Sequence, residues 1–373
     1  MPIYKMNGKK DGLQKYRVFI NYTDNYGNYH KKSKIAYGLD EAKEAERSLG
    51  LEVLQNKSDS KMTVRQLYDE YISVKKHEVR ITTLDKSSAI LKREILPVFR
   101  DIKIDKISIP LLQKWKTSVA ERSLAITTKN NIYTEFRAML NYAVKMEYIT
   151  KNPLNSIGNF KNPNFETKEE RLQYYTAEEF KKFIAAAKAH IQSLNEYGYY
   201  IFFNIAFYTG MRKGEINALK WSDIEGDFIH VRRSVAQKIK GQPIIETPPK
   251  NKSSYRTLQM PVPLIKLLKE YKDRCQKLNG FTDDYRVCGG ISCLSDTAIS
   301  NKNIQYAAEA GLKPIRIHDF RHSHASLLAN EGINIQEIAR RLGHSKIETT
   351  WNTYSHLYPR EEERAVKILN EVK

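Results

Sequence analysis

Cysteine, long apolar segments and acidic residues are all scarce in this 373-residue sequence. The three cysteines, Cys275, Cys288 and Cys293, are too few for a disulfide framework, which favours a reducing compartment. No apolar run approaches the ~20 residues that a membrane helix needs. The first residues, MPIYKMNGKKDG, lack the apolar core of a signal peptide. We therefore expect a cytoplasmic protein that makes no contact with a membrane.

The shortage of acidic residues leaves a large positive charge. Asp and Glu number 43 against 62 Lys and Arg, a formal net charge of +19, while the 17 Gly and 12 Pro are too few for a low-complexity chain. The surplus is +3 over residues 1–60, +9 over 61–165 and +7 over 166–373. This distribution excludes a neutral enzyme with one basic tail. It favours a protein that wraps a long polyanion, most commonly nucleic acid.

The residue pattern at the start of the chain predicts a small module over residues 1–58. In residues 14–37, side chains of two kinds alternate with the two-residue period of a β-strand. Residues 24–28 between them are of the types that favour turns, which indicates a β-hairpin or sheet. Helical spacing follows from about residue 40 to residue 54. The predicted module is therefore a hairpin or sheet plus one helix, which is small for an independent core.

In the rest of the chain, the apolar residues recur mostly at the spacing of an amphipathic helix. Residues 61–155 predict an all-α unit of four or five helices, and the polar, periodless stretch 156–172 predicts a linker. Residues 173–373 predict a mostly α unit with a small antiparallel sheet from strands near 228–233 and 255–260. A capping box at Thr176 and Glu179 marks its first helix. The expected fold class is multidomain and mainly α.

Four separated segments of the last unit carry unusual polar groups. Taken singly, each has an ordinary structural explanation, because an arginine after a glycine turn usually forms a surface ion pair and a helical tyrosine is usually half-buried core. The informative feature is that these residue types occur together and in this order along the chain. The segments are TGMRKGEI with Arg212, PKNKSSYR with Lys250, HDFRH with His318 and Arg321, and LGH with His344 followed by Tyr354.

This ordered set resembles the tyrosine recombinase family, the phage-type integrases. The family pattern is arginine, lysine, histidine-x-x-arginine, histidine or tryptophan, then tyrosine, and the contexts TGMRKGEI, HDFRHSHASLLANEG and LGHSKIETTWNTYSH match as well. The predicted all-α unit is similar to the family's core-site-binding domain. The first module resembles the arm-site-binding module of phage and conjugative-transposon integrases. The resemblance implies a bacterial, nucleoid-associated enzyme that integrates and excises a mobile genetic element.

The resemblance also implies phosphoryl transfer on DNA without a metal, ATP or any other cofactor. Tyr354 would attack a backbone phosphate and form a 3′-phosphotyrosyl intermediate, with Tyr358 as the alternative nucleophile. Arg212 and Arg321 would clamp the phosphate oxygens. Lys250 would protonate the leaving 5′-oxygen, and Lys252 on the same hairpin is the alternative acid.

The remaining polar side chains of the motifs have supporting or open roles. His318 would act either as the general base for Tyr354 or as a ligand of the phosphate, and His344 would donate to a phosphate oxygen. Glu215 would orient Arg212 or a histidine. His322 is assigned to packing of the helix that holds Arg321. His318 and His322 have the spacing of metal ligands on a helix, but no carboxylate motif accompanies them, so we expect no metal.

The expected partners are the core and arm attachment sites of double-stranded DNA, bound by a homo-tetramer with possible help from an excisionase and a host DNA-bending protein. The amphipathic tail 361–373 would dock on a neighbouring subunit or pack on its own domain. Alternative functions are an Xer-like chromosome-dimer resolvase, a catalytically silent DNA-binding regulator and a type IB topoisomerase. The candidate arm-site contacts are Arg17, Tyr22, Lys31, Lys32 and Lys34.

Overall fold

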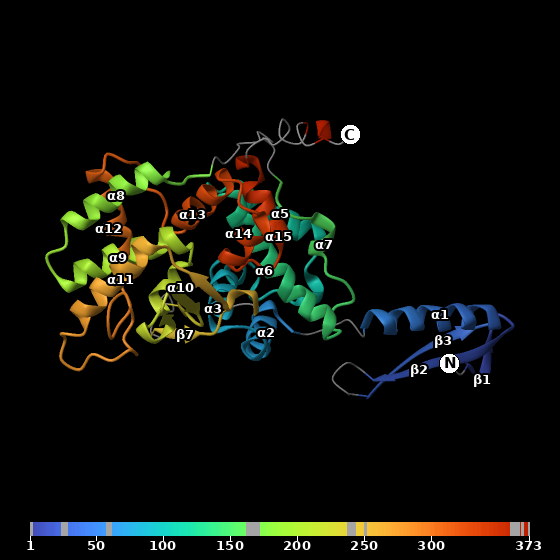
Figure 1. Cartoon of the computed structure of the whole chain (residues 1–373). Coiled ribbons are helices and arrows are strands. Elements are labelled where there is room, and N and C mark those ends of the chain that lie inside the picture. The colour runs from blue at the N-terminus through green and yellow to red at the C-terminus, as the bar shows by residue number, and fades with distance from the viewer. Residues whose placement is uncertain are drawn as a thin grey trace. The chain divides into compact units, whose positions relative to one another are not determined.

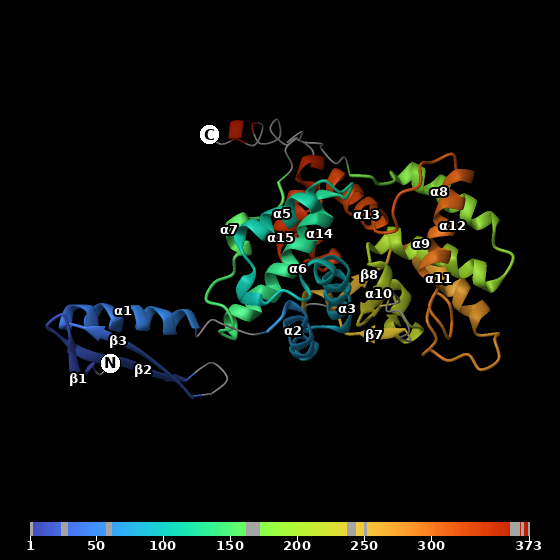
Figure 2. The same ribbon diagram turned by 180° about the vertical axis from the view of Figure 1, so that it is seen from behind.

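The computed structural model divides the chain into two compact units, residues 1–166 and 167–373 (Figures 1 and 2). Each unit is described below by itself. The expected tail 361–373 lies outside the described residues except for Val366, Leu369, Asn370 and Glu371. The structure describes residues 3–23, 29–56, 62–161, 172–236, 244–249, 252–358, 366 and 369–371.

The chain begins with a three-stranded antiparallel sheet and one helix, where we expected a hairpin or sheet and a helix. The strands are β1 (Ile3–Lys10), β2 (Leu13–Thr23) and β3 (Tyr29–Tyr37), in the order β1-β2-β3, and the helix is α1 (Leu39–Asn56). Val18 and Ala36 of the sheet pack against Ala42 and Leu49 of α1 in a small core. The sequence pattern missed β1 because the strand is almost wholly exposed and does not alternate regularly.

The helical part of the first unit follows the predicted pattern closely. Its elements are α2 (Val64–Glu78), α3 (Ile81–Ile90), the π-helical turn η1 (Leu91–Ile95), α4 (Leu96–Phe99), the 3-10 turn η2 (Ile104–Lys106), α5 (Ile109–Ala120), α6 (Ile126–Lys145) and α7 (Leu154–Ile157). The rings of Phe99, Trp115 and Phe136 meet in its core at centroid distances of 5.1–6.0 Å.

This core extends further along the chain than the sequence suggested. Leu154 is fully buried and Phe160 is nearly so, although 156–172 was expected to be a linker. The ammonium group of Lys116 holds the segment by donating to the carbonyl oxygens of Ile157 and Gly158 at 2.8 and 3.1 Å. Ile157 and Phe160 therefore pack on the helical core, and residues 162–171 lie outside the described residues.

The second unit is mostly helical with two small antiparallel sheets. One sheet has the order β4-β5-β8 and the other pairs β6 with β7, a hairpin that the sequence pattern did not reveal. The Thr176–Glu179 capping box forms as predicted. The elements are α8 (Ala177–Ala189), α9 (Leu194–Thr209), α10 (Lys213–Ala218), η3 (Trp221–Asp223), β4 (Ile224–Glu225), β5 (Phe228–Val231), β6 (Ser234–Ala236), β7 (Ile245–Thr247), η4 (Lys252–Ser254), β8 (Arg256–Gln259), α11 (Val262–Cys275), α12 (Asp296–Glu309), α13 (Asp319–Asn330), α14 (Ile335–Leu342), α15 (Ile347–Tyr354) and η5 (Ser355–Leu357).

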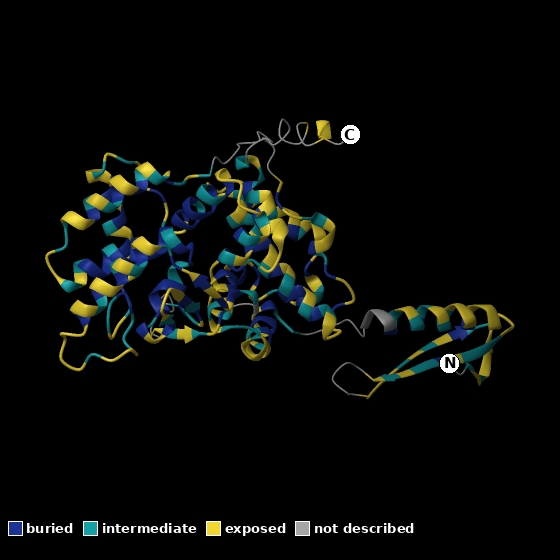
Figure 3. Cartoon of the chain, in the orientation of Figure 1, coloured by how far each residue is buried: buried dark blue, intermediate teal, exposed yellow. Residues whose placement is uncertain are grey.

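Helix α9 is the centre of the second unit. It packs against α8, α10, α11 and α13, and from residue 197 to residue 207 every residue but Tyr200 is buried (Figure 3). A helix buried all round is fixed in position by its neighbours, and so is the chain that leaves its C-terminal end. None of the described helices is long and apolar enough to cross a membrane.

Candidate active site

The candidate site begins where α9 ends. Gly210 has φ +64°, a conformation that favours glycine, and an added Cβ would lie only 2.7 Å from Cδ2 of His324. His324 is buried there, with Nδ1 bonded to the carbonyl oxygen of Phe207 at 2.9 Å. Burial holds the pKa of His324 at about 3, so the ring is a neutral packing group. This close approach positions Arg212, two residues further along.

Three arginine side chains converge on the C-terminal end of α14. Arg256 donates to the carbonyl oxygen of Arg341 at 2.7 Å, Arg321 to that of Leu342 at 2.6 Å, and Arg212 makes a longer contact of 3.5 Å with that of Gly343. The last carbonyls of a helix lack partners within the helix and carry its negative dipole end, so they attract cations. Successive carbonyls thus gather arginines from three distant parts of the sequence.

Arg321 is the most deeply buried of the three, with 3% of its surface exposed. Its second hydrogen bond goes to the carbonyl oxygen of Gly210 at 2.9 Å, so it ties the end of α9 to the end of α14. Burial, together with the nearby charge of Arg212, lowers its pKa to about 9, which still leaves it charged at pH 7. Both of these acceptors are neutral, which leaves the positive charge available to an anionic ligand.

Glu215 is the acidic partner of the cluster. It accepts from Arg212 at 2.8 Å and from Arg256 at 2.8 Å, and it caps the start of α10 through the backbone of Arg212. Burial alone would raise the pKa of Glu215, but the charges and hydrogen bonds of Arg256 and Arg212 outweigh it and lower the pKa. Of the partners expected for Glu215, the structure therefore places an arginine and not a histidine in contact.

Arg256 is a residue that the sequence analysis did not single out. It lies at the start of β8 in the quoted segment PKNKSSYR, and an arginine beside a Lys/Ser loop reads as a solvated surface residue. Its burial follows from the tertiary contact with α14, to which no local pattern points. The only available signal was its place six residues after Lys250 in a motif segment.

Two histidines flank the arginines. His344 follows Gly343, the left-handed cap of α14, and its Nδ1 bonds the hydroxyl of Thr350 at 2.8 Å. His318 is the N-cap residue of α13. Burial first, and then neighbouring positive groups, lower the pKa of each to about 4. Both rings are therefore neutral at pH 7, and a neutral imidazole has one N–H to donate.

Tyr354, the last residue of α15, is 2% exposed. Its hydroxyl lies 2.6 Å from Nδ1 of His322, and burial raises its pKa to about 12. The assignment of His322 to helix packing is therefore incomplete, because the side chain meets the candidate nucleophile while His324 does the packing. Tyr358 points elsewhere, since its hydroxyl donates to the carbonyl oxygen of Ile333 at 2.6 Å.

Lys250 lies outside the described residues, and for Lys252 the structure describes only the backbone at the start of η4. The described part of this turn is nevertheless next to the arginines. A Cβ on Gly343 would lie 3.0 Å from the carbonyl oxygen of Ser253 and 3.1 Å from Nη1 of Arg256. The described turn η4 therefore lies next to the end of α14.

The N-terminal sheet separates the five candidate DNA contacts between its two faces. Directly paired residues share a face, so Lys32 and Lys34 lie with Ile20 and Val18 on the side that α1 covers. Both lysines pair there with Glu52, at 3.8 and 2.7 Å.

Tyr22 lies two residues after Ile20 on β2, so its side chain is on the same face as Ile20 and Val18. Its ring stacks on that of His30. Arg17 and Lys31 lie on the opposite face, where the ammonium group of Lys31 sits 4.5 Å from the ring centre of Phe19 and Tyr4 stacks on that ring.

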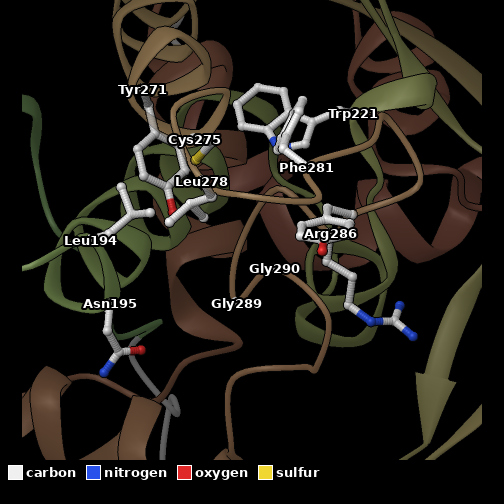
Figure 4. Close-up of a pocket in the computed structure, with 11 residues that line it drawn as sticks. Leu194, Asn195, Trp221, Tyr271, Cys275, Leu278, Phe281, Arg286, Gly289 and Gly290 are labelled. Carbon is white, nitrogen blue, oxygen red and sulfur yellow. The ribbon is translucent and has the colours of Figure 1, made fainter.

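Other features of the second unit are separate from this cluster. Among the described residues, no group of three or more His, Cys, Asp or Glu is arranged to hold a metal ion. A cavity of about 170 Å³ lies between Trp221, Tyr271, Phe281 and Arg286 (Figure 4). It shares no lining residue with the arginine cluster, and its aromatic walls do not suit a phosphate.

Comparison with known proteins agrees with this arrangement. The phage integrase family matches residues 173–361, and the phage integrase N-terminal SAM-like domain matches residues 63–119. The chain belongs to the phage integrase family. Its members are tyrosine recombinases, so the chain is a site-specific recombinase that cleaves and rejoins DNA.

Relatives and solved structures extend the likeness over most of the integrase. The ICEBs1 integrase of Bacillus subtilis (strain 168) is 30% identical over 76% of each chain. The Tn1549 transposon integrase in complex with a circular intermediate DNA has the same fold, with a TM-score of 0.65 and 20% identity over 83% of this chain and 99% of that one. A lambda integrase tetramer bound to a Holliday junction gives a TM-score of 0.56 and 19% identity over 93% and 96%.

Substitution of Gly210 by alanine should destabilise the integrase by about 2–4 kcal/mol, because left-handed strain and the clash with His324 add together. Chemical denaturation of the full chain measures the change. Gly311→Ala is the matched control, because Gly311 also follows a helix with φ +67° but has nothing within 4 Å of an added Cβ. The control should lose only about 1 kcal/mol. Equal losses would show that the His324 contact is unimportant.

Substitution of Glu215 by glutamine should lower the free energy of unfolding by about 3 kcal/mol at pH 7, because two arginines lose a buried countercharge. The folded pKa of Glu215 is lowered, so its stabilisation is fully present above the ordinary value of 4.5 and is lost as the pH falls through the folded value. Denaturation curves of wild type and variant should therefore converge in acid. A constant difference down to pH 3 would contradict this assignment.

Proposed function

We propose that this integrase cuts DNA by nucleophilic attack of Tyr354 on a backbone phosphate and rejoins it by the reverse reaction. The observation that carries the proposal is the binding of three arginines to successive carbonyls at the end of α14, directly before His344. Three guanidinium groups and one carboxylate leave an excess of two positive charges in a mostly buried place. Such a site is complementary to the charge that builds on phosphate oxygens in the transition state.

The roles of the arginines follow from their exposure. Arg212 is the most exposed, with 38% of its side chain open to solvent, so it would bind a phosphate oxygen first. Arg321 would bind the same phosphate from its more buried position. The planar guanidinium of each arginine favours paired hydrogen bonds to phosphate oxygens. Arg256 has three hydrogen bonds within the protein and would act by holding Glu215. The neutral rings of His318 and His344 would each donate one N–H.

The leaving 5′-oxygen needs a proton, which we assign to Lys250 with Lys252 as the alternative. Support comes from the described part of their turn, where Arg256 donates to the carbonyl oxygen of Ser254 at 3.2 Å. A lysine held near such cations would have a lowered pKa and become a better acid. Attack by the tyrosine hydroxyl forms the 3′-phosphotyrosyl bond and breaks the bond from phosphorus to the 5′-oxygen. The energy of the phosphodiester is kept in the new bond, so rejoining needs no ATP.

We further propose that the integrase acts as a homo-tetramer on core sites, in the cytoplasm at the nucleoid, to integrate and excise a mobile element. The Tn1549 integrase bound to a circular intermediate DNA and the lambda integrase tetramer on a Holliday junction support this. An excisionase and a host DNA-bending protein are further expected partners. A silent DNA-binding regulator is disfavoured because the sequence carries the whole motif set, Arg212, Lys250, His318, Arg321, His344 and Tyr354.

The open face of the N-terminal sheet is the surface we propose for arm sites. Arg17 and Lys31 lie on it beside the stacked rings of Tyr4 and Phe19, so cations and flat apolar groups are presented together. Lys34 is removed from this proposal because it donates to Glu52 and to Ser48 of α1. Lys32 is removed because its ammonium group lies 3.8 Å from Glu52, and Tyr22 because it lies on this side of the sheet and not with Arg17 and Lys31.

Substitution of Tyr354 by phenylalanine should abolish covalent protein–DNA adducts on a nicked core-site duplex, because the attacking oxygen is removed. Denaturing electrophoresis of the reaction detects the adduct as a slow band. Tyr358→Phe is the control and should still form the adduct, since the hydroxyl of Tyr358 donates a hydrogen bond to the carbonyl oxygen of Ile333. Adducts formed by the Tyr354 variant would overturn the choice of nucleophile.

Joint substitution of Arg17 and Lys31 by alanine should weaken arm-site binding by about tenfold or more, because one charged contact each is lost. Fluorescence anisotropy with separate arm-site and core-site duplexes measures both affinities. Core-site affinity should stay unchanged. Lys34→Ala is the control and should bind arm DNA as the wild type does. A larger loss from Lys34→Ala than from the double variant would place the DNA on the wrong face.

A further inference from the structure

The group that contacts the candidate nucleophile is His322 and not the motif histidine His318. Nδ1 of His322 lies 2.6 Å from the hydroxyl oxygen of Tyr354, within the range of a strong hydrogen bond. His318 also contacts His322, edge to face at 5.2 Å between ring centres. His322 therefore contacts both of the other rings, since its ring centre lies 5.7 Å from that of Tyr354.

The other nitrogen of His322 faces a buried carboxylate. Nε2 lies 4.0 Å from Oδ1 of Asp319, one turn earlier on α13, and Asp319 is wholly buried. Arg316 holds this carboxylate in place with hydrogen bonds of 3.0–3.2 Å. Carboxylate, imidazole and hydroxyl thus stand in the order in which hydrolases arrange an acid, a histidine and a nucleophile, although the distance to Asp319 is longer than a hydrogen bond.

We propose that His322 is the proton acceptor for Tyr354 and that Asp319 orients its ring. This rests on the proposed function, in which Tyr354 is the nucleophile. The neutral ring carries its proton on Nε2, toward Asp319, and presents the lone pair of Nδ1 to the tyrosine. As the phenolic oxygen bonds to phosphorus and the bond to the 5′-oxygen breaks, the phenolic proton moves to Nδ1. The 5′-oxygen takes its proton from Lys250 or Lys252, and rejoining returns both protons.

The surroundings of His322 suit a base. Burial lowers its pKa from 6.5, which Arg316 and Arg321 reinforce and Asp319 opposes, so the ring is neutral at pH 7. The pKa of His318 is lowered by burial first and then by the charges of His322, Arg321 and Arg212. The other charged or titratable groups on elements packed against α13 include Tyr208 on α9, Glu337, Arg340 and Arg341 on α14, and His356 on η5.

The test is the pH dependence of single-turnover cleavage of a nicked duplex that carries the core sequence from the element's junction. The main variant is His322→Asn. The amide oxygen of asparagine can occupy the place of Nδ1 and accept a hydrogen bond from the tyrosine hydroxyl, but it cannot take up the phenolic proton. We expect cleavage to slow by about 10²–10⁴-fold. In the wild type the rate falls in acid as His322 becomes protonated, below pH 6.5 because its pKa is lowered. This acidic decline should disappear in the variant.

Three controls keep the outcome interpretable. His356→Gln changes an exposed histidine and should keep both the rate and the acidic decline. His318→Gln should slow cleavage but keep the acidic decline. Core-site affinity and the thermal midpoint of the His322 variant show whether it is folded, and His322→Gln serves as the second variant if it is not.

Two outcomes are distinguished. A His322→Asn enzyme that cleaves within about threefold of wild type, or that keeps the acidic decline, would overturn the role of His322 while leaving Tyr354 as nucleophile. Adducts formed by Tyr354→Phe would instead overturn the proposed function on which the inference rests.

Discussion

The second unit depends on one constraint, which is that three arginine side chains must stand close together at the end of α14. Like charges at such distances repel by several kcal/mol in a partly buried place. Three successive carbonyl oxygens at the end of α14 offset this repulsion, because each accepts a hydrogen bond from a different arginine. Glu215 adds one full negative charge between two of them.

The rest of the unit brings these arginines to that point. Arg212 comes from the turn after α9, Arg256 from the start of β8 and Arg321 from α13. Two glycines make the approach possible, because a side chain at Gly210 would strike His324 and one at Gly343 would press on Ser253 and Arg256. The apolar α9 then acts as the fixed reference, since its burial on all sides leaves its last turn little freedom.

The sequence predicted much of this, and its failures have physical causes. The capping box at Thr176 and Glu179 located the start of α8, since capping is a local property of the sequence. The motif order brought out Arg212, His318, Arg321, His344 and Tyr354 together, and the structure places these within one unit. Arg256 was missed because its burial arises from a contact with α14, 85 residues away in sequence.

Two further differences show what local patterns omit. The contact of His322 with Tyr354 depends on how α13 packs against α15, to which the i, i+4 spacing of the histidines gives no guide. In the N-terminal sheet, Lys31 and Lys34 looked equivalent as charges. Pairing of Val18 with Lys34 and of Asn21 with Lys31 places them on opposite faces, and that register follows from the strand pairing and not from composition.

Burial acts in different ways on the groups of the site, and together these set its resting state. It lowers the pKa of Arg321 only to about 9, so the arginine stays charged, whereas it brings His318 and His344 to about 4 and leaves them neutral. It raises the pKa of Tyr354 to about 12, so the proposed nucleophile keeps its proton. At pH 7 the cations that attract a phosphate are therefore permanent, while attack requires removal of a proton. A neutral base in contact with the hydroxyl meets that need at the moment the phosphate arrives, which is why the position of His322 matters more than the number of histidines.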